Sequence, residues 1–449
     1  MKKAFKAYDI RGIFNRDFNL DDVYKIGYFL PQLLKSSKVL VGRDVRLSSD
    51  DIFTALAKGI NDAGADVYNA GLTTTPMVYW ATAKYGFEAS VQITASHNSK
   101  EYNGLKISRS EALPVGYDTG LNQLEKLIES EQVIVKPQTG KVIPFNFVDE
   151  YLAFIFKYKT EFNDLNIAVD CSNGMASLFI KKLMGEQIHY LYDQPDGNFP
   201  NHEPNPLEEK NVEDLKKLVL EKHCDIGIIF DGDADRVMFV DDCGRFVRPD
   251  IMIALLGDYF KQHYTKAKVV IDIRSSKLVA AYLEKSGFET HLWKVGRAFA
   301  ALKLRELDAV FGGELAGHYY FKDFYFSDSA FLAVMLILNV VSKKHRQGIK
   351  LSEWVDEING SWANSGEINF RIEQKAEAME ALKKHFTSIE KPLAFHDFDG
   401  YRIEFEKWWF NVRPSNTEPY LRFLAEAETK EILNKNLEQV QTIIKYFEH

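Results

Sequence analysis

A serine and a histidine side by side in a short loop are the first residues of this sequence that could do chemistry. Ser96 and His97 follow residues 89–93 (ASVQI), which predict a short buried strand that ends in a polar turn. A serine hydroxyl is a weak nucleophile at neutral pH unless a base takes its proton or it already carries a transferable group. Because most serine–histidine pairs in loops are ordinary turn residues, this pair alone does not establish a catalytic site.

Three carboxylates at alternate positions follow a second apolar strand. Asp231, Asp233 and Asp235 come directly after residues 226–230 (IGIIF). Oxygen ligands at this spacing suit a hard divalent cation. A calcium loop of the EF-hand type would have a glycine at its sixth position, where this chain has Arg236, and another apolar strand follows that arginine. The pattern therefore favours a magnesium-type site over a calcium loop or a plain acidic turn.

Two later loops have the composition of ligand-binding segments. Residues 312–318 (GGELAGH) combine glycines, which let a backbone approach a ligand closely, with the polar groups of Glu314 and His318. Residues 413–419 (RPSNTEP) offer a guanidinium, two hydroxyls, an amide and several backbone N–H groups in a tight turn. Such a loop fits a phosphate group, although as an isolated pattern it is more often a simple turn.

Taken in order, these motifs resemble those of the α-D-phosphohexomutases, most closely the bacterial phosphomannomutase/phosphoglucomutase branch. Residues 8–12 (YDIRG) and 102–106 (YNGLK) also match, so the resemblance covers nearly the whole chain. It implies an α/β fold of three related domains with mixed sheets and a C-terminal α+β domain, arranged around a central cleft. The expected domains are 1–142 with the phosphoserine loop, 143–246 with the metal loop, 247–361 with the sugar-specificity loop and 362–449 with the phosphate-binding loop.

The resemblance also implies the reaction. The enzyme would be an isomerase that interconverts hexose 1-phosphate and hexose 6-phosphate, with mannose, glucose or both as the sugar. Ser96 would carry the phosphoryl group and exchange it with the sugar through a hexose 1,6-bisphosphate, while Ser96 and the three aspartates would hold Mg²⁺. We expect Lys106 to be the general base, with His97, Arg11 and His318 as the other polar groups near the reacting hydroxyl. Arginine is a poor base, so Arg11 would stabilise charge. Without the motif, the preferred interpretation of Lys106 is a solvated lysine on a strand.

A larger set of residues is expected to hold the sugar phosphate. Glu314 would bind sugar hydroxyls, and the 413–417 segment would grip whichever phosphate is not reacting. Arg274 and Arg297 are predicted substrate contacts for which solvated surface arginines are the alternative. The expected substrate-binding residues are Tyr8, Arg236, Arg274, Arg297, Glu314, His318, Arg413, Ser415, Asn416 and Thr417.

One departure from the family pattern leaves the sugar open. Family members often have serine where this chain has Ala316, so one hydroxyl contact to the sugar is missing or replaced by water. The glucosamine branch usually has Gln-Ser where this chain reads Leu315 and Ala316. A phosphoglucosamine mutase, a phosphoserine-dependent sugar phosphatase and a sugar-phosphate-binding protein without turnover therefore remain the alternatives, and the first two are the closer ones.

Composition limits the class of protein. A chain of 449 residues with 46% hydrophobic residues can bury several cores. Its net charge of −8 provides no basic stripe for nucleic acid. Three scattered cysteines make no disulfide framework or zinc site, and the most apolar run, residues 331–341, is far shorter than the about 20 residues that span a bilayer. We expect a cytoplasmic monomer or homodimer with no signal peptide, no membrane contact and a small sugar phosphate as its partner.

Three similar strand–loop–helix patterns are predicted to position the motifs. Apolar runs at 38–41, 166–170 and 268–272 each lead into a polar turn and then a helix. Their spacing suggests three related α/β units, with coincidence of common turns as the alternative. The pattern then changes after residue 366. The last part is predicted to have strands near 367–371, 401–405, 408–412 and 420–427 and helices near 375–386 and 430–447.

Overall fold

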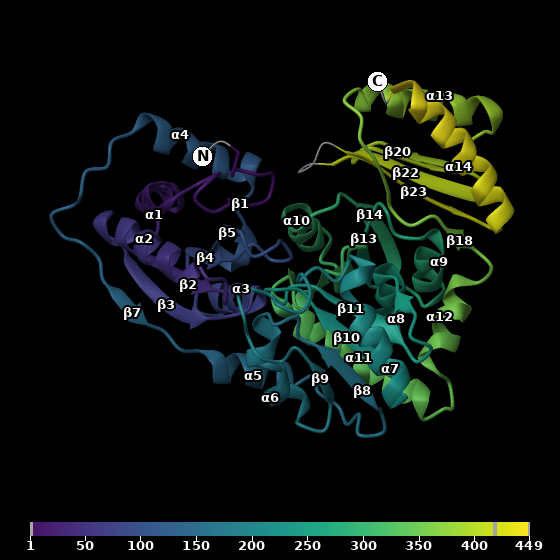
Figure 1. The fold of residues 1–449 in the computed structure, drawn as a ribbon, viewed down its shortest axis with the longest axis horizontal. Helices are drawn as coiled ribbons and strands as arrows, with labels where there is room; N and C mark the ends of the chain where they lie inside the picture. The colour runs from purple at the N-terminus through teal and green to yellow at the C-terminus, as the bar shows by residue number, and fades with distance from the viewer. Residues whose placement is uncertain (1–2, 416–419, 448–449) are drawn as a thin grey trace.

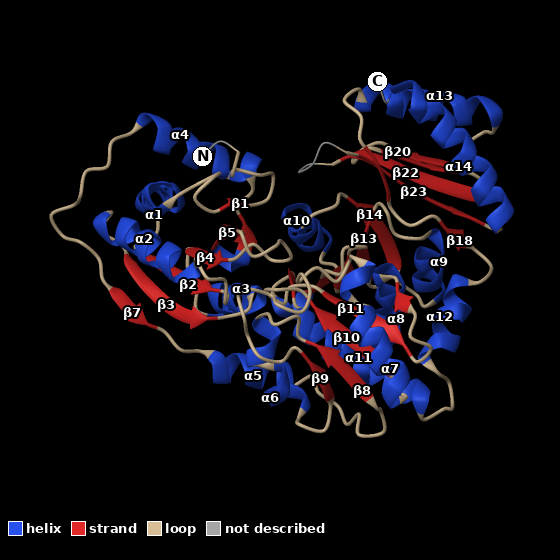
Figure 2. Ribbon diagram, viewed as in Figure 1, coloured by secondary structure: helices blue, strands red, loops and turns tan. Residues whose placement is uncertain are grey.

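The computed structural model describes residues 3–415 and 420–447, which form four sheets covered by helices (Figures 1 and 2). The first unit (purple to blue in Figure 1) and the C-terminal unit (yellow) lie on opposite sides of the view, with the two middle units between and below them. None of the helices in the described chain combines the length and apolar character needed to cross a bilayer.

The first sheet has the order β1-β5-β4-β2-β3-β7, with β6 paired to β5. Strands β2, β3 and β4 are parallel, and β5 runs antiparallel to β4. Its strands are β1 (Ile10–Ile13), β2 (Lys38–Arg43), β3 (Asp66–Leu72), β4 (Ala89–Ile93), β5 (Tyr102–Arg109), β6 (Leu113–Pro114) and β7 (Val142–Pro144). Its helices are α1 (Leu20–Leu34), α2 (Ser49–Asp62), α3 (Thr75–Lys84) and α4 (Leu121–Ser130), with short 3-10 turns η1 (Ser110–Ala112) and η2 (Tyr117–Thr119).

The second sheet has the order β12-β11-β10-β8-β9 and repeats the central part of the first. Its strands are β8 (Ile167–Asp170), β9 (His189–Leu191), β10 (Ile226–Phe230), β11 (Val237–Asp241) and β12 (Phe246–Val247). Its helical segments are α5 (Val148–Phe156), η3 (Met175–Leu178), α6 (Ile180–Met184), η4 (Glu209–Asn211) and α7 (Glu213–Lys222). The helix predicted after the strand 166–170 is only the short pair η3 and α6, and Ser172 and Asn173 turn the chain through left-handed conformations (φ 51° and 52°) before it.

The third sheet, of order β14-β13-β15-β16-β17, has the same plan again. Its strands are β13 (Lys268–Asp272), β14 (Glu289–Trp293), β15 (Phe311–Gly313), β16 (Tyr319–Phe321) and β17 (Ser327–Asp328). Its helical segments are α8 (Pro249–Phe260), α9 (Lys277–Lys285), α10 (Arg297–Leu307), η5 (Lys322–Phe324), α11 (Ala330–His345) and α12 (Leu351–Asn359). In each of the three sheets, one strand pairs in parallel on one side and antiparallel on the other: β4, β10 and β15. The loops that follow these three strands carry Ser96, Asp231 and Glu314, respectively.

The C-terminal unit is an α+β layer of order β18-β23-β22-β21-β20, with β19 also paired to β23. Its strands are β18 (Ala363–Asn364), β19 (Ile368–Phe370), β20 (Ala394–His396), β21 (Tyr401–Glu404), β22 (Trp408–Pro414) and β23 (Leu421–Ala427). Its helices are α13 (Lys375–Ile389) and α14 (Lys430–Ile444), followed by η6 (Lys445–Phe447). The predicted change from α/β units to a final α+β domain is confirmed.

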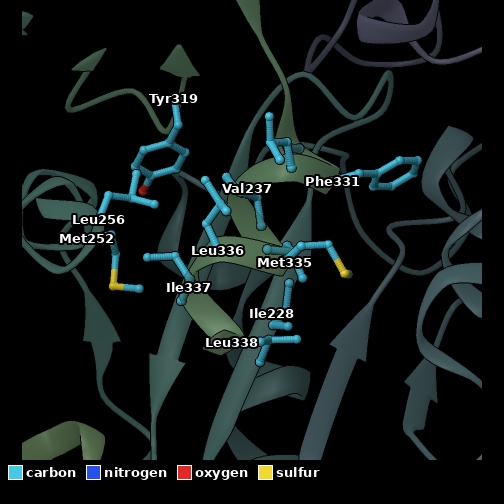
Figure 3. Packing of buried hydrophobic residues seen from close by; sticks show 14 of the residues in the cluster. Ile228, Val237, Met252, Leu256, Tyr319, Phe331, Met335, Leu336, Ile337 and Leu338 are labelled. Carbon is cyan, nitrogen blue, oxygen red and sulfur yellow. The ribbon is translucent and has the colours of Figure 1, made fainter. Parts of the chain in front are cut away.

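The apolar core follows the same division. The second and third units share one buried cluster, in which α11 packs against β10, β11 and α8 (Figure 3). Residues 331–341, the most apolar run of the sequence, lie inside α11, and most of that helix is buried. The first and last units have clusters of their own, although α3 of the first unit also packs into the shared cluster. The first unit therefore meets the middle of the molecule partly through apolar packing of α3, whereas no described residue of the last unit belongs to the shared cluster.

Candidate active site

Ser96 is held in an unusual backbone conformation at the end of β4. Its φ of 53° lies in the left-handed region, which non-glycine residues seldom adopt. The buried guanidinium of Arg46 donates to the carbonyl oxygens of Ser96 (2.8 Å) and Asn98 (2.6 Å), and is itself paired with Asp44 (3.1 Å). Because these bonds fix both ends of the turn, the hydroxyl is presented in one direction. Sequence reasoning did not identify Arg46, which belongs to the loop after β2.

The Ser96 hydroxyl meets the acidic loop across the boundary between the first two units. Ser96 Oγ donates a hydrogen bond of 2.7 Å to Asp231 Oδ2. Asp231, Asp233 and Asp235 are all buried, with oxygens within 4.8 Å of one another. Burial raises the pKa of Asp231 well above its usual range, and the charges of the other two aspartates act in the same direction. The hydroxyl and the three carboxylates, which lie far apart in sequence, thus form one cluster.

The acidic cluster has the features of a cation site. Thr75, at the start of α3, and Lys106, on β5, both donate to Asp233 Oδ2, and Lys106 also donates to Asp235. Asp233 Oδ1 and Asp235 Oδ1 are buried and have no hydrogen-bond partner among the described residues. Buried carboxylate oxygens without partners are costly, and a hard divalent ion satisfies such a donor set. Ser96 and the three aspartates therefore fit a hard divalent cation, and the role of Thr75 could not be predicted from the sequence.

The remaining polar groups of the first unit line the same side. Arg11 pairs with Asp9 and donates to Asn98 Oδ1 (2.9 Å). His97 Nδ1 lies 3.4 Å from Ser96 Oγ. Burial, reinforced by nearby arginines, lowers the pKa of His97 well below its usual value, so this imidazole is neutral. A neutral ring beside the serine leaves the positive charge here to Arg11 and Lys106.

His318 forms a hydrogen-bonded series that the sequence did not predict. Its Nδ1 lies 2.6 Å from Asp328 Oδ2, and its Nε2 accepts from Arg236 Nε at 3.0 Å. The arginine N–H can only donate, so Nε2 carries the lone pair and Nδ1 carries the proton. Asp328 lies on β17, opposite Tyr320 of β16, and only this register brings it beneath His318. Burial raises the pKa of Asp328, but the hydrogen bond from His318 and the positive charges of Arg297 and Lys106 outweigh it, so the pKa lies below its usual value.

The third unit supplies the groups suited to a sugar. Glu314 accepts from Tyr320 OH (2.5 Å) and from the backbone N–H of Gly296 (3.2 Å), and burial raises its pKa. Arg297 donates to Asp328 (3.2 Å) and stacks 3.5 Å above the ring of Tyr79. Arg297 and Arg274, predicted as substrate contacts with solvated surface arginines as the alternative, are both paired side chains. Arg274 is 6% exposed and is held by Asp272 (2.7 Å) and Glu367 (3.4 Å).

A single cavity of about 1180 Å³ connects these groups with the C-terminal unit. Arg413 lies at its far side and pairs with Asp399 at 3.3 Å. Ser96, Asp231 and Asp233 are fully buried and lie beside this cavity rather than in its lining, and Asn416 and Thr417 lie outside the described residues. The predicted residues that line the cavity are Tyr8, Arg11, His97, Lys106, Asp235, Arg236, Arg274, Arg297, Glu314, His318, Arg413 and Ser415.

Comparison with known proteins agrees with this architecture over the whole chain. Four family models match in succession: phosphoglucomutase/phosphomannomutase alpha/beta/alpha domain I at residues 2–134, domain II at 146–244, domain III at 248–360 and the C-terminal domain at 367–442. Each covers most of one of the four sheets described above.

Individual relatives span the full length as well. A phosphomannomutase of Methanocaldococcus jannaschii is 35% identical over 447 residues, which cover 98% of this chain and 97% of the relative. A phosphomannomutase of Escherichia coli K12 is also 35% identical, over 95% of this chain and 96% of the relative. The crystal structure of a phosphoglucomutase/phosphomannomutase family protein from Burkholderia thailandensis superimposes with a TM-score of 0.86 at 26% identity, over 99% of this chain and 98% of that protein. With four matching domains in order and relatives alike from end to end, the chain belongs to the phosphoglucomutase/phosphomannomutase family.

Proposed function

We propose that the protein is a phosphohexomutase that interconverts hexose 1-phosphate and hexose 6-phosphate, with mannose or glucose as the sugar. Ser96 carries the phosphoryl group, and a hexose 1,6-bisphosphate is the intermediate. The observation that carries the proposal is the hydrogen bond of 2.7 Å between Ser96 Oγ and the acidic cluster, next to a cavity whose far side holds Arg413. A reactive hydroxyl at one end of the cavity and a phosphate-binding arginine at the other suit a substrate that can react at either of its two ends.

We assign the metal to the buried carboxylates. Asp231, Asp233, Asp235 and the Ser96 oxygen would hold Mg²⁺, a donor set that suits a hard cation and would satisfy the two unpartnered carboxylate oxygens. When bound, the ion supplies positive charge that offsets the charge of the transferring phosphoryl group. Arg11 and Arg236 add fixed positive charge from the cavity side.

From the contacts of the side chains we infer a different general base from the one expected from the sequence. Lys106 was the residue expected from the sequence, but its ammonium donates to both Asp233 and Asp235 and has no lone pair to offer. His318 Nε2 does have a lone pair, which accepts from Arg236 Nε here and becomes free when a substrate phosphate draws that arginine away, and Asp328 holds the opposite nitrogen. We therefore assign proton transfer with the sugar hydroxyl to His318, and electrostatic stabilisation of the transferring group to Lys106.

Substrate binding divides between the two ends of the cavity. Arg413 and Ser415, together with Asn416 and Thr417 of the same segment, grip the phosphate that is not reacting, because they read charge and tetrahedral shape and so accept both orientations of the bisphosphate. Glu314 binds sugar hydroxyls. The other residues assigned to the substrate are Tyr8, Arg236, Arg274, Arg297 and His318, all of which line the cavity.

The wider assignments follow from the same premises. We propose the domain boundaries 142/143, 246/247 and 361/362, a small-molecule sugar phosphate as the partner, and a monomer or homodimer in the cytoplasm. The three cysteines are all free thiols, which is usual for proteins of reducing compartments.

The test is a turnover assay with a matched serine control. The purified chain, with Mg²⁺ and a trace of glucose 1,6-bisphosphate, is expected to isomerise mannose 1-phosphate and glucose 1-phosphate faster than glucosamine 1-phosphate. Ser96→Ala should lower this rate by about 10³-fold or more, because it removes the group that is transferred, with the melting temperature close to that of the parent. Ser99→Ala, in the same loop, should keep the parental rate. Undiminished turnover by Ser96→Ala would reject the assignment, and release of free phosphate in place of isomerisation would identify a phosphatase.

A further inference from the structure

Asp399 lies outside the cavity but touches the residue that would grip phosphate. It stands in the turn between β20 and β21, and its Oδ1 accepts from Arg413 Nε at 3.3 Å. The turn is pressed onto β22 at this point: the next residue, Gly400, has a φ of 69°, and a Cβ there would come within 2.2 Å of the carbonyl oxygen of Val412. The position of the carboxylate relative to the guanidinium of Arg413 is therefore fixed.

The second oxygen of Asp399 binds another unit of the molecule. Oδ2 accepts from the backbone N–H of Val295 at 2.8 Å, in the loop that joins β14 to α10 of the third unit. The aromatic rings of Phe398 and Trp293 stack beside this bond, with centroids 5.6 Å apart and planes at 28°. One carboxylate thus connects the phosphate grip of the last unit with the backbone of the third.

The loop that Asp399 binds is itself connected to the sugar end of the cavity. Its residue Val295 accepts from Tyr8 OH at 3.1 Å, and the N–H of Gly296 donates to Glu314 at 3.2 Å. Gly296 has a φ of 116°, and a Cβ on it would lie 2.8 Å from the Tyr8 ring, so the loop has little room to shift. Any displacement of Val295 would therefore move the backbone donor that orients Glu314.

From this geometry we propose that Asp399 is a positioning residue for substrate binding. It orients Arg413 toward the non-reacting phosphate and anchors that grip to the loop 294–296, so that the phosphate site and the Glu314 sugar site keep a fixed separation. The inference rests on the proposed function, because it assumes that the cavity holds a sugar phosphate between these two sites. Sequence motifs do not indicate the role of Asp399, which lies outside the lining of the cavity.

The physical consequence concerns affinity more than chemistry. The non-reacting phosphate stays bound to Arg413 in both the ground state and the transition state, so a misplaced guanidinium weakens both equally. Uniform binding of this kind appears in KM and in the dissociation constant, with kcat nearly unchanged. Hexose 1-phosphate and hexose 6-phosphate should be affected alike, because each presents its non-reacting phosphate to the same residue.

The test compares Asp399→Asn with Asp397→Asn, an exposed aspartate two residues earlier in the same turn. Asparagine at 399 has only one acceptor oxygen for two donors and no charge, whereas the control makes the same change of charge on the surface. The dissociation constant for glucose 6-phosphate is measured by equilibrium titration of each protein with unphosphorylated Ser96 and Mg²⁺, together with KM, kcat and the melting temperature. Asp399→Asn should raise the dissociation constant and KM about tenfold, a loss typical of a hydrogen bond to a charged group, and change kcat less than threefold. Asp397→Asn should stay within twofold of the parent.

A second background separates positioning from general damage. If Asp399 acts on phosphate binding through the guanidinium of Arg413, Asp399→Asn should add less than threefold to the dissociation constant of Arg413→Lys, because lysine has no second nitrogen to be oriented. Equal effects in the two backgrounds, a dissociation constant within twofold of the parent, or an equal effect of Asp397→Asn would overturn the inference. Intact binding of glucose 6-phosphate without any mutase turnover would instead count against the proposed function, and the titration would still decide the role of Asp399.

Discussion

At the scale of single residues, Ser96 combines a strained backbone with a strong set of contacts. A non-glycine residue at φ 53° costs on the order of 1–3 kcal/mol. Arg46 donates hydrogen bonds to the carbonyl oxygens of Ser96 and Asn98, and Ser96 donates one to Asp231. These bonds offset that cost. Since Arg46 is buried and paired with Asp44, it cannot relax toward solvent. The strain therefore stays at the serine, which points its hydroxyl at the carboxylates.

His202 gives a residue-scale prediction for pH. Its Nε2 lies 3.1 Å from Asp170 at the end of β8, and its ring packs edge-on against Tyr192, beside Asp214. Burial lowers the pKa of His202, but the hydrogen bond and charge of Asp170 outweigh it and raise the pKa above the ordinary value of 6.5. A folded-state pKa above the unfolded one stabilises the fold fully below about pH 6.5, and this stabilisation is lost as the pH rises through the raised value.

His202→Gln should therefore melt below the parent at pH 5.5, and the gap between the two melting temperatures should close toward pH 8.5. Glutamine can still donate a neutral hydrogen bond to Asp170, so the variant isolates the effect of charge. The measurement is thermal unfolding across this pH range. The exposed His263→Gln serves as the control and should give a small gap with no trend. A gap for His202→Gln that stays constant with pH would contradict the protonated pair.

At the scale of elements, α1 and α2 approach each other through two glycines. A Cβ on Gly27 would lie 2.3 Å from the carbonyl oxygen of Leu56, and one on Gly59 would lie 2.0 Å from that of Tyr24. Both glycines are inside helices, where alanine would be favoured by about 1 kcal/mol on propensity alone. The backbone contact between the helices thus outweighs local preference at these positions.

Gly27→Ala should for this reason destabilise the first unit by about 1–3 kcal/mol, because the two helices must move apart to admit one methyl group. Gly257→Ala in α8 is the matched control: there the added Cβ would meet the end of the Leu283 side chain at 2.5 Å, and a side chain can turn aside. Thermal or urea unfolding of both variants is the measurement. If Gly27→Ala is as stable as the parent, the helices are not in backbone contact in solution.

Elements also explain what could be predicted from the sequence and what could not. Ser96, the three aspartates and Glu314 were found because each follows an apolar strand in a recognisable loop, and the strands 226–230 and 268–272 lie where the apolar pattern predicted them. Thr75, Asp328 and Asp399 were missed because their partners are set by packing between units, by strand register and by a turn in a different domain. The helix predicted after the strand 166–170 is shorter than expected for a related reason. A Cβ on Gly174 would lie 2.7 Å from the carbonyl oxygen of Gly232, so the backbone there follows the metal loop rather than helical propensity.

At the scale of the whole molecule, the cleft is bordered by units that differ in how firmly they are attached. The second and third units share a core, but the last unit has its own and is joined to the third by buried polar contacts. Among these, Arg248 pairs with Glu426, and Arg402 donates to the carbonyl oxygens of Ile273 (2.8 Å) and Ser275 (2.6 Å) in the loop after β13. Contacts of this type are specific and directional, so they determine the position of Arg413 relative to the other end of the cavity.

Arg402→Met tests this attachment at the scale of the molecule. The Arg402 side chain is 1% exposed and also stacks 3.9 Å over Trp409; methionine can keep much of that packing but leaves two carbonyls of the third unit without their donor. The variant also loses the ion pair with Glu404 of the same strand. Losing the two bonds to the third unit should weaken docking of the last unit by about 2–5 kcal/mol, raise KM for the hexose phosphate more than tenfold and speed proteolysis within residues 360–366. The exposed Arg371→Met, on the same unit, should match the parent in both measurements. If Arg402→Met also matches the parent, the last unit is held by its remaining contacts, and the position of the phosphate grip does not depend on this arginine.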